Sequence, residues 1–153
     1  MVGSSEKVRR FLKDNNIPVS LVELDKSTRT SQMAADALGC SVAQIAKSIV
    51  FINGGTSVVV ISGDKRVDGE KLSRILGHRV SIANADAVRK NTGYVIGGVP
   101  PFPHDEGVMV FLDSSLSRFE EVWTAAGTPN SVFKISTKVM RGTLGTDFVD
   151  ISE

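Results

Sequence analysis

Two apolar segments on either side of a glycine-containing turn constrain the fold most. Residues 48–52 and 57–62 are rich in β-branched and aromatic side chains, which favour β-strands. The residues between them begin with Asn53-Gly54, and this pair is a strong short-range signal for a β-hairpin. The sequence therefore predicts an antiparallel hairpin, with residues 48–52 as a buried strand.

Further helices and strands alternate irregularly around this hairpin. Capping residues and apolar periodicity predict helices after Ser4 or Ser5, after Thr30 or Ser31, after Ser41, and over residues 69–76, 85–90, 116–120 and 137–144. Short apolar runs predict strands over residues 19–24, 78–82, 108–112, 122–125, 131–135 and 148–151. Because hairpins mix with helical crossovers, we expect a mixed α/β (α+β) fold. Residues 1–153 are expected to form a single domain, with a curled, mixed, mostly antiparallel sheet and helices packed outside it.

The composition excludes several classes of protein. Hydrophobic residues make up 41% of the 153 and charged residues 23%, which is ordinary for a soluble domain. No apolar run approaches the roughly 20 residues of a membrane helix, and no signal peptide is recognisable, so we expect a cytoplasmic protein without a membrane partner. Cys40 is the only cysteine and only two histidines are present, so neither a disulfide, a metal site nor a cofactor is expected.

The charges are distributed unevenly, although the net charge is only +1. Residues 65–90 contain seven cationic and three anionic side chains, whereas residues 105–125 contain five anionic and one cationic. The first segment could present a basic face to phosphate groups. The alternative, which charge alone favours, is that both segments are solvated helix surfaces.

Lys47 stands immediately before the buried strand 48–52. Its side chain must either run along the sheet towards water or direct its ammonium group into a cleft. Far along the chain, residues 97–107 contain glycine and proline too densely for a helix or strand. A loop of this kind between packed elements is a usual place for a functional site.

The common catalytic motifs are absent. Asp113-Ser114-Ser115 does not form a G-x-S-x-G nucleophile motif, and residues 63–66 lack the spacing of a phosphate-binding Walker loop. The chain therefore lacks the usual equipment for nucleophilic or metal-assisted catalysis.

Lys47 and the segment Gly97-Gly98-Val99-Pro100-Pro101 together resemble the YbaK-like family, the freestanding relatives of the editing domain inserted in bacterial prolyl-tRNA synthetases. The resemblance covers most of the chain, through Arg29-Thr30 and residues 34–39, 44–48, 93–102, 110–113 and 126–130. It implies a mixed α/β domain with a curled sheet. It also implies hydrolysis of the ester that joins a wrong amino acid to tRNA.

The resemblance also implies roles for individual residues. Lys47 matches the family's essential lysine, and Gly97 and Pro101 match its G-x-x-x-P loop. Lys47, Gly97 and Gly98 are the expected catalytic residues, since backbone N–H groups of a glycine-rich loop can donate to a developing oxyanion. The expected substrate-binding residues are Thr30, Tyr94, Val99, Pro101, Gly127 and Thr128.

The chain departs from the family pattern just after this loop. Relatives often carry a glycine where this sequence has Pro103-His104-Asp105, so the loop's conformation cannot be carried over directly. His104 could contact substrate or transfer a proton, or it could be an exposed loop histidine.

The expected function is that of a trans-editing deacylase acting on tRNA mischarged with a small amino acid such as alanine or cysteine, on tRNA(Pro). Its partners are expected to be the 3′ acceptor end of aminoacyl-tRNA and an aminoacyl-tRNA synthetase. The family's range also includes serine and threonine, and Thr128 and the residues near Tyr94 are expected to select among them. Two alternatives stay open: a non-catalytic module that binds aminoacyl-tRNA or an amino acid, and an interaction domain that retains only the fold.

Overall fold

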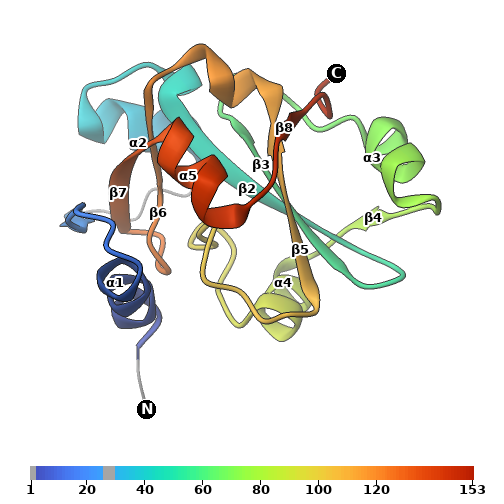
Figure 1. Ribbon diagram of the computed structural model, residues 1–153, viewed down its shortest axis with the longest axis horizontal. Coiled ribbons are helices and arrows are strands. Elements are labelled where there is room, and N and C mark those ends of the chain that lie inside the picture. The colour runs from blue at the N-terminus through green and yellow to red at the C-terminus, as the bar shows by residue number, and fades with distance from the viewer. Residues whose placement is uncertain (1–2, 26–29) are drawn as a thin grey trace.

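The computed structural model of the chain describes residues 3–25 and 30–153 (Figure 1). Its α-helices are α1 (Ser4–Asp14), α2 (Ser31–Leu38), α3 (Gly69–Leu76), α4 (Ala85–Thr92) and α5 (Thr137–Leu144), with two 3₁₀ turns, η1 (Val42–Gln44) and η2 (Ser114–Arg118). Its strands are β1 (Val22–Glu23), β2 (Ile45–Ile52), β3 (Thr56–Ser62), β4 (Ser81–Ile82), β5 (Val108–Asp113), β6 (Glu121–Ala125), β7 (Ser131–Ser136) and β8 (Phe148–Val149).

The predicted hairpin forms the centre of the sheet. Strands β2 and β3 pair antiparallel, with Ala46 opposite Ser62 at one end and Phe51 opposite Ser57 at the other. Asn53 at the turn has φ 84°, a left-handed conformation that asparagine tolerates better than most residues. The sequence prediction of the hairpin is confirmed.

The sheet is mixed, as expected. Its strands lie in the order β1-β7-β6-β2-β3-β5-β8, and β4 pairs with β2 outside this path. The pairs β1–β7, β2–β3, β2–β4 and β6–β7 are antiparallel, whereas β2–β6, β3–β5 and β5–β8 are parallel. The predicted mixed α/β class is therefore confirmed.

Helices cover both faces of the sheet (Figure 1). Alternate residues of β3 enter different apolar clusters, since Val58 and Val60 lie in the largest cluster while Val59 and Ile61 lie in a second one. Helices α1, α4 and α5 contribute to the largest cluster, α3 to the second and α2 to a third. The strand is thus buried on both sides, which explains its continuous apolar sequence.

Several predicted boundaries need correction. β2 begins at Ile45, so Lys47 is the third residue of the strand and does not precede it. The strands predicted over residues 19–24 and 78–82 shrink to the exposed pairs in β1 and β4. The strand predicted over residues 148–151 is the two-residue β8. α1 is capped by Gly3, without a side-chain bond from Ser4 or Ser5.

One edge of β2 is only partly paired. β6 pairs with this edge at Ile45 and Ala46, and β4 pairs with it at Phe51 and Ile52. No described strand pairs with it between these points, apart from a bond from the Ala83 N–H to the Val50 carbonyl (2.8 Å). This leaves a gap in the sheet beside Lys47.

Among the described residues, no helix is long and apolar enough to cross a membrane.

Candidate functional site

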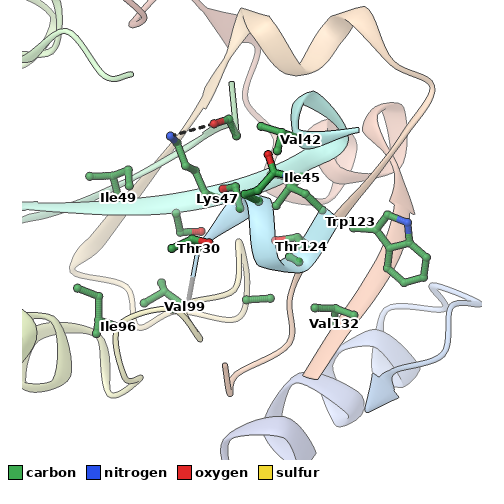
Figure 2. A pocket seen from close by; sticks show the side chains of 18 residues that line it. Thr30, Val42, Ile45, Lys47, Ile49, Ile96, Val99, Trp123, Thr124 and Val132 are labelled. Carbon is green, nitrogen blue, oxygen red and sulfur yellow. Dashed lines mark hydrogen bonds between the residues drawn. The ribbon is translucent and has the colours of Figure 1, made fainter. Parts of the chain in front are cut away.

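A cavity of about 530 Å³ lies beside this gap in the sheet. Figure 2 shows that side chains from several elements surround it, with Lys47 on β2, Thr30 before α2 and Val99 on the glycine-rich loop. Its walls are formed by Thr30, Ser31, Gln32, Ala34, Val42, Ile45, Ala46, Lys47, Ser48, Ile49, Gly63, Ile96, Gly97, Val99, Trp123, Thr124, Ala125 and Val132. The cavity therefore joins segments that are far apart in the sequence.

Lys47 enters the cavity half-buried. Its Nζ lies 3.4 Å from the carbonyl oxygen of Gly63, to which it donates a hydrogen bond (Figure 2). An ammonium group has three donors, so further N–H groups are available to a ligand. Of the two conformations left open by the sequence, the structure has the one directed into a cleft.

Burial lowers the pKa of Lys47 below the usual value for lysine. Desolvation is the largest cause, because it penalises the charged form. The negative charge of Asp64 opposes this effect and the positive charge of Arg66 adds to it. Asp64 is itself held by Arg118, whose Nη2 lies 2.7 Å from Asp64 Oδ1, so its charge is partly engaged elsewhere.

The two glycines of the loop have different surroundings. Gly97 lines the cavity and has φ 84°, a conformation that glycine adopts at no steric cost. Gly98 is buried behind it, and a Cβ atom there would lie 2.9 Å from backbone atoms of Thr128. The Gly98 N–H already donates to the Val95 carbonyl (2.9 Å). Because this N–H is already engaged, the geometry does not fit the expected donation from Gly98 to an oxyanion. The absence of a side chain at Gly98 lets the loop approach Thr128 closely.

A hydrogen bond from Tyr94 holds the glycine-rich loop on the side of the core. Tyr94 is buried and its hydroxyl donates to the Pro103 carbonyl at 2.8 Å. Burial raises the pKa of Tyr94 to about 12, so the phenol is a stable donor. The Phe102–Pro103 peptide bond is cis. None of these residues lines the cavity.

His104 contacts both Tyr94 and the loop. Its ring packs edge-on against Tyr94 (centroids 5.5 Å apart), and its Nε2 lies 2.7 Å from the Pro100 carbonyl. A carbonyl only accepts, so Nε2 carries the proton. Burial lowers the pKa of His104, which favours the neutral ring. His104 is neither an exposed loop histidine nor a residue of the cavity wall.

Gly127 and Thr128 lie on the far side of the loop. A Cβ at Gly127 would lie 2.5 Å from the backbone carbonyl oxygen of Ser4 in α1. The Thr128 hydroxyl bonds to Ser131 Oγ (2.7 Å) and to Asn130. Neither residue lines the cavity, and the absence of a side chain at Gly127 lets this turn approach α1 closely.

The structure thus brings together only part of the predicted set. Lys47, Gly97, Val99 and Thr30 line one cavity, and the Thr30 hydroxyl also caps α2 by accepting from the Met33 N–H (3.1 Å). Gly98, Tyr94, Pro101, Gly127 and Thr128 are not among the lining residues. Arg29, which forms part of the family resemblance, lies outside the described residues.

Sequence reasoning missed several lining residues, including Ser48 on β2 and Thr124 on β6. A signal for Ser48 exists, because a polar residue interrupts an apolar strand directly after Lys47. Thr124 gives no such signal, since threonine is common in strands. Its position depends on the parallel pairing of β6 with β2, which the sequence does not display.

The lining residues have a distinctive chemistry. Among those that the structure describes, none is Asp, Glu, His or Cys. The wall therefore offers a cation, hydroxyl groups, backbone N–H groups and apolar surface, without a carboxylate or imidazole beside the hydroxyls. Such an arrangement can hold and polarise a ligand by electrostatics and hydrogen bonding.

Comparison with known proteins supplies the family. Residues 25–142 match the aminoacyl-tRNA editing domain. The uncharacterized protein YwhH of Bacillus subtilis is 34% identical over 137 residues, which cover 88% of this chain and 87% of YwhH.

Solved structures agree with this assignment. A protein proposed to be a trans-editing enzyme for prolyl tRNA synthetase is 36% identical, with a TM-score of 0.91, over 100% of this chain and 99% of that one. The hypothetical protein APE2540 is 32% identical, also with a TM-score of 0.91, over 97% of this chain and 100% of that one. The chain belongs to the aminoacyl-tRNA editing domain family.

Proposed function

We propose that the chain is a trans-acting aminoacyl-tRNA deacylase that hydrolyses the ester between tRNA and a wrongly attached small amino acid. The observation that carries this proposal is the half-buried Lys47 in a cavity that Gly97 and Val99 close from the loop side. The likeness to a protein proposed to serve prolyl tRNA synthetase favours tRNA(Pro) as the substrate tRNA. The enzyme would act in the cytoplasm, on tRNA released by a synthetase.

The cavity suits the end of an aminoacyl-tRNA. Its volume of about 530 Å³ lies in the usual range for small-molecule sites. The free N–H groups of Lys47 would contact a phosphate or ribose hydroxyl of the terminal adenosine. The Gly97 N–H would donate to the ester carbonyl oxygen as negative charge develops on it.

The attacking group in this mechanism is a water molecule or a hydroxyl of the substrate. No described lining side chain is Asp, Glu, His or Cys, so the wall hydroxyls lack the carboxylate or imidazole partner that usually activates a nucleophile. Attack by water at the carbonyl carbon forms a new C–O bond and breaks the ester C–O bond, whereas attack by a substrate hydroxyl first moves the acyl group to that hydroxyl and water then cleaves the new ester. The amino acid leaves as a carboxylate, and the ribose hydroxyl of the tRNA is regenerated with a proton.

A deacylation panel tests the proposal. Purified protein is mixed with tRNA carrying alanine, cysteine, serine or threonine, including tRNA(Pro) charged with alanine or cysteine, and release is followed against time. We expect catalysed release from at least one of them. Lys47→Ala should reduce the rate by ~10²-fold or more, because the terminal adenosine would no longer hold the ester in position at Gly97.

The matched control is Lys13→Ala, which removes an exposed cation that neither lines the cavity nor belongs to the basic segment 65–90. Its rate should stay close to that of the unaltered protein. Equal rates for Lys47→Ala and the unaltered protein would contradict the proposed mechanism. Bound but unhydrolysed aminoacyl-tRNA, in the unaltered protein as well, would instead support the non-catalytic binding module.

A further inference from the structure

Two hydroxyl groups of the cavity wall have no hydrogen-bond partner in the part of the chain that the structure describes. They are Ser48 Oγ and Thr124 Oγ1, and both oxygens are buried. Thr124 as a whole is only 1% exposed. Because buried polar groups are nearly always paired, and leaving one unpaired costs free energy, this pair requires an explanation.

The pairing of the strands places the two hydroxyls on one face. Thr124 on β6 stands opposite Ala46 on β2 in a parallel ladder. Ser48 lies two residues beyond Ala46, and side chains two residues apart in a strand share a face. Ala46 also lines the cavity on this face, and its small side chain leaves room beside the hydroxyls.

Ser48 also lies in the unpaired stretch of the β2 edge. The Val50 carbonyl accepts from Ala83 at this edge, and backbone groups of alternate residues point to the same edge of a strand. The Ser48 N–H and C=O therefore point into the gap between β6 and β4. No described strand pairs with them there, so Ser48 presents polar atoms of both its backbone and its side chain.

This polar region is separate from Lys47. Consecutive residues of a strand point to opposite faces, so Lys47 and Ser48 reach the cavity from opposite sides of the sheet. Ala46, which shares a face with Ser48, belongs to the same apolar cluster as Val99 on the loop. The cation and the unpaired hydroxyls thus reach the cavity from opposite faces of β2.

We infer that Ser48 and Thr124 are specificity-determining residues that hydrogen-bond a hydroxyl on the side chain of the attached amino acid. The preferred substrates then carry serine or threonine. This inference rests on the proposed function and narrows its substrate. Rotation about the Cα–Cβ bond moves either oxygen between staggered positions and turns it towards the ligand. Alanine would leave both hydroxyls unpaired, and sites that pair with a substrate hydroxyl discriminate strongly against analogues without it.

The test compares release of serine, threonine and alanine from the same tRNA by the unaltered protein and by Thr124→Val, which keeps the shape and removes the hydroxyl. We expect serine to be released faster than alanine. Thr124→Val should lower serine and threonine release by about tenfold and change alanine release by less than about twofold. Ser48→Ala should act in the same direction, and Thr124→Ser should restore the preference.

Ser62→Ala is the matched control. Ser62 Oγ is also buried without a described partner, but Ser62 does not line the cavity. Its loss should leave the preference unchanged. An equal loss for all three amino acids in Thr124→Val would overturn the inference, because the hydroxyl would then act on a part that all substrates share. A preference for alanine in the unaltered protein would also overturn it.

A second measurement separates this inference from the proposed function. Stable amide analogues, in which serine or alanine is joined to 3′-amino-3′-deoxyadenosine, report binding without hydrolysis. Tighter binding of the seryl analogue, lost in Thr124→Val, would support the inference even if no tRNA were deacylated. Equal binding of the two analogues would contradict it, whatever the deacylation panel shows.

Discussion

The two faces of β2 differ sharply where they meet the cavity. One face presents Lys47, whose ammonium group is half-buried and donates to the Gly63 carbonyl. The other presents Ser48, whose hydroxyl has no partner among the described residues. Successive residues of one strand thus provide a charge and a neutral polar group on opposite sides of the same sheet.

Under the proposed function, the two faces of β2 would bind different parts of the substrate. A cation suits the part of the substrate that is the same for every amino acid, because each aminoacyl-tRNA ends in the same adenosine. Buried hydroxyls suit the part that varies, since a polar group left unpaired penalises the wrong ligand. Changes on the Lys47 face should therefore affect all substrates alike, and changes on the Ser48 face should affect their ratio.

The largest effect outside these two residues is expected from Gly98→Ala. The new Cβ would lie 2.9 Å from the backbone of Thr128, so the glycine-rich loop must shift away from Thr128. Overpacking of this kind costs about 1–3 kcal/mol of stability. The displaced loop should also reduce deacylation. It should weaken the preference among amino acids as well, because Val99 belongs to the same apolar cluster as Ala46, which shares a face with Ser48.

Thermal unfolding and deacylation rates check this prediction together. Gly69→Ala is the control, since a Cβ at Gly69 meets nothing within 4 Å and the residue needs no left-handed conformation. A Gly98→Ala protein as stable and as active as the Gly69→Ala protein would show that the close contact with Thr128 is unimportant.

A smaller effect concerns pH and tests the Lys47 face. Desolvation lowers the pKa of Lys47, so its positive charge is lost at a lower pH than in an ordinary lysine. Binding of tRNA that carries no amino acid should therefore weaken as the pH rises through this lowered pKa. Lys47→Arg should remove the weakening, because arginine stays charged.

Binding is the better measure here, because alkaline solution hydrolyses aminoacyl esters without an enzyme. Titrations across the alkaline range with both proteins would decide the question. The same pH dependence in Lys47→Arg would assign the titrating group to another residue.

The smallest effect is expected at the rim of the Lys47 face. Arg66 is exposed and lies close enough to lower the pKa of Lys47. Arg66→Glu should weaken the binding of tRNA to the same extent whichever amino acid the tRNA carries. It should also reduce the slope of log affinity against log salt concentration by about the contribution of one phosphate contact. Lys71 is less available, because it bonds to Asp150 and to the Ser152 carbonyl. Lys71→Glu should therefore alter tRNA binding less, which affinity measurements at two salt concentrations would show.

Local patterns predicted much of the fold. The β2–β3 hairpin followed from Asn53-Gly54 between apolar runs, and the bounds of α3 and α5 agree with the predicted 69–76 and 137–144. Each of these helices has a side-chain cap and a glycine stop, which are local signals. Strands β1 and β4 were predicted too long because their pairing depends on distant strands.

The site was predictable only in part, for a similar reason. Lys47 and Gly97 could be found because the resemblance to a family marks them. The positions of Ser48 and Thr124 depend on the register of β6 against β2 and on the gap between β6 and β4. Long-range strand pairing of this kind leaves little trace in a single sequence. Thr128 and the residues near Tyr94 were expected to select the amino acid. The Thr128 hydroxyl bonds to Ser131, the Tyr94 hydroxyl bonds to the Pro103 carbonyl, and neither of these two residues lines the cavity.

The most direct test of this division is the ratio of kcat/KM for seryl-tRNA to that for alanyl-tRNA. It should be measured in the unaltered protein, in Lys47→Arg and in Thr124→Val. The account predicts that Lys47→Arg lowers both values and leaves their ratio unchanged, whereas Thr124→Val lowers the ratio by about tenfold. A ratio that changes in Lys47→Arg and stays constant in Thr124→Val would contradict it.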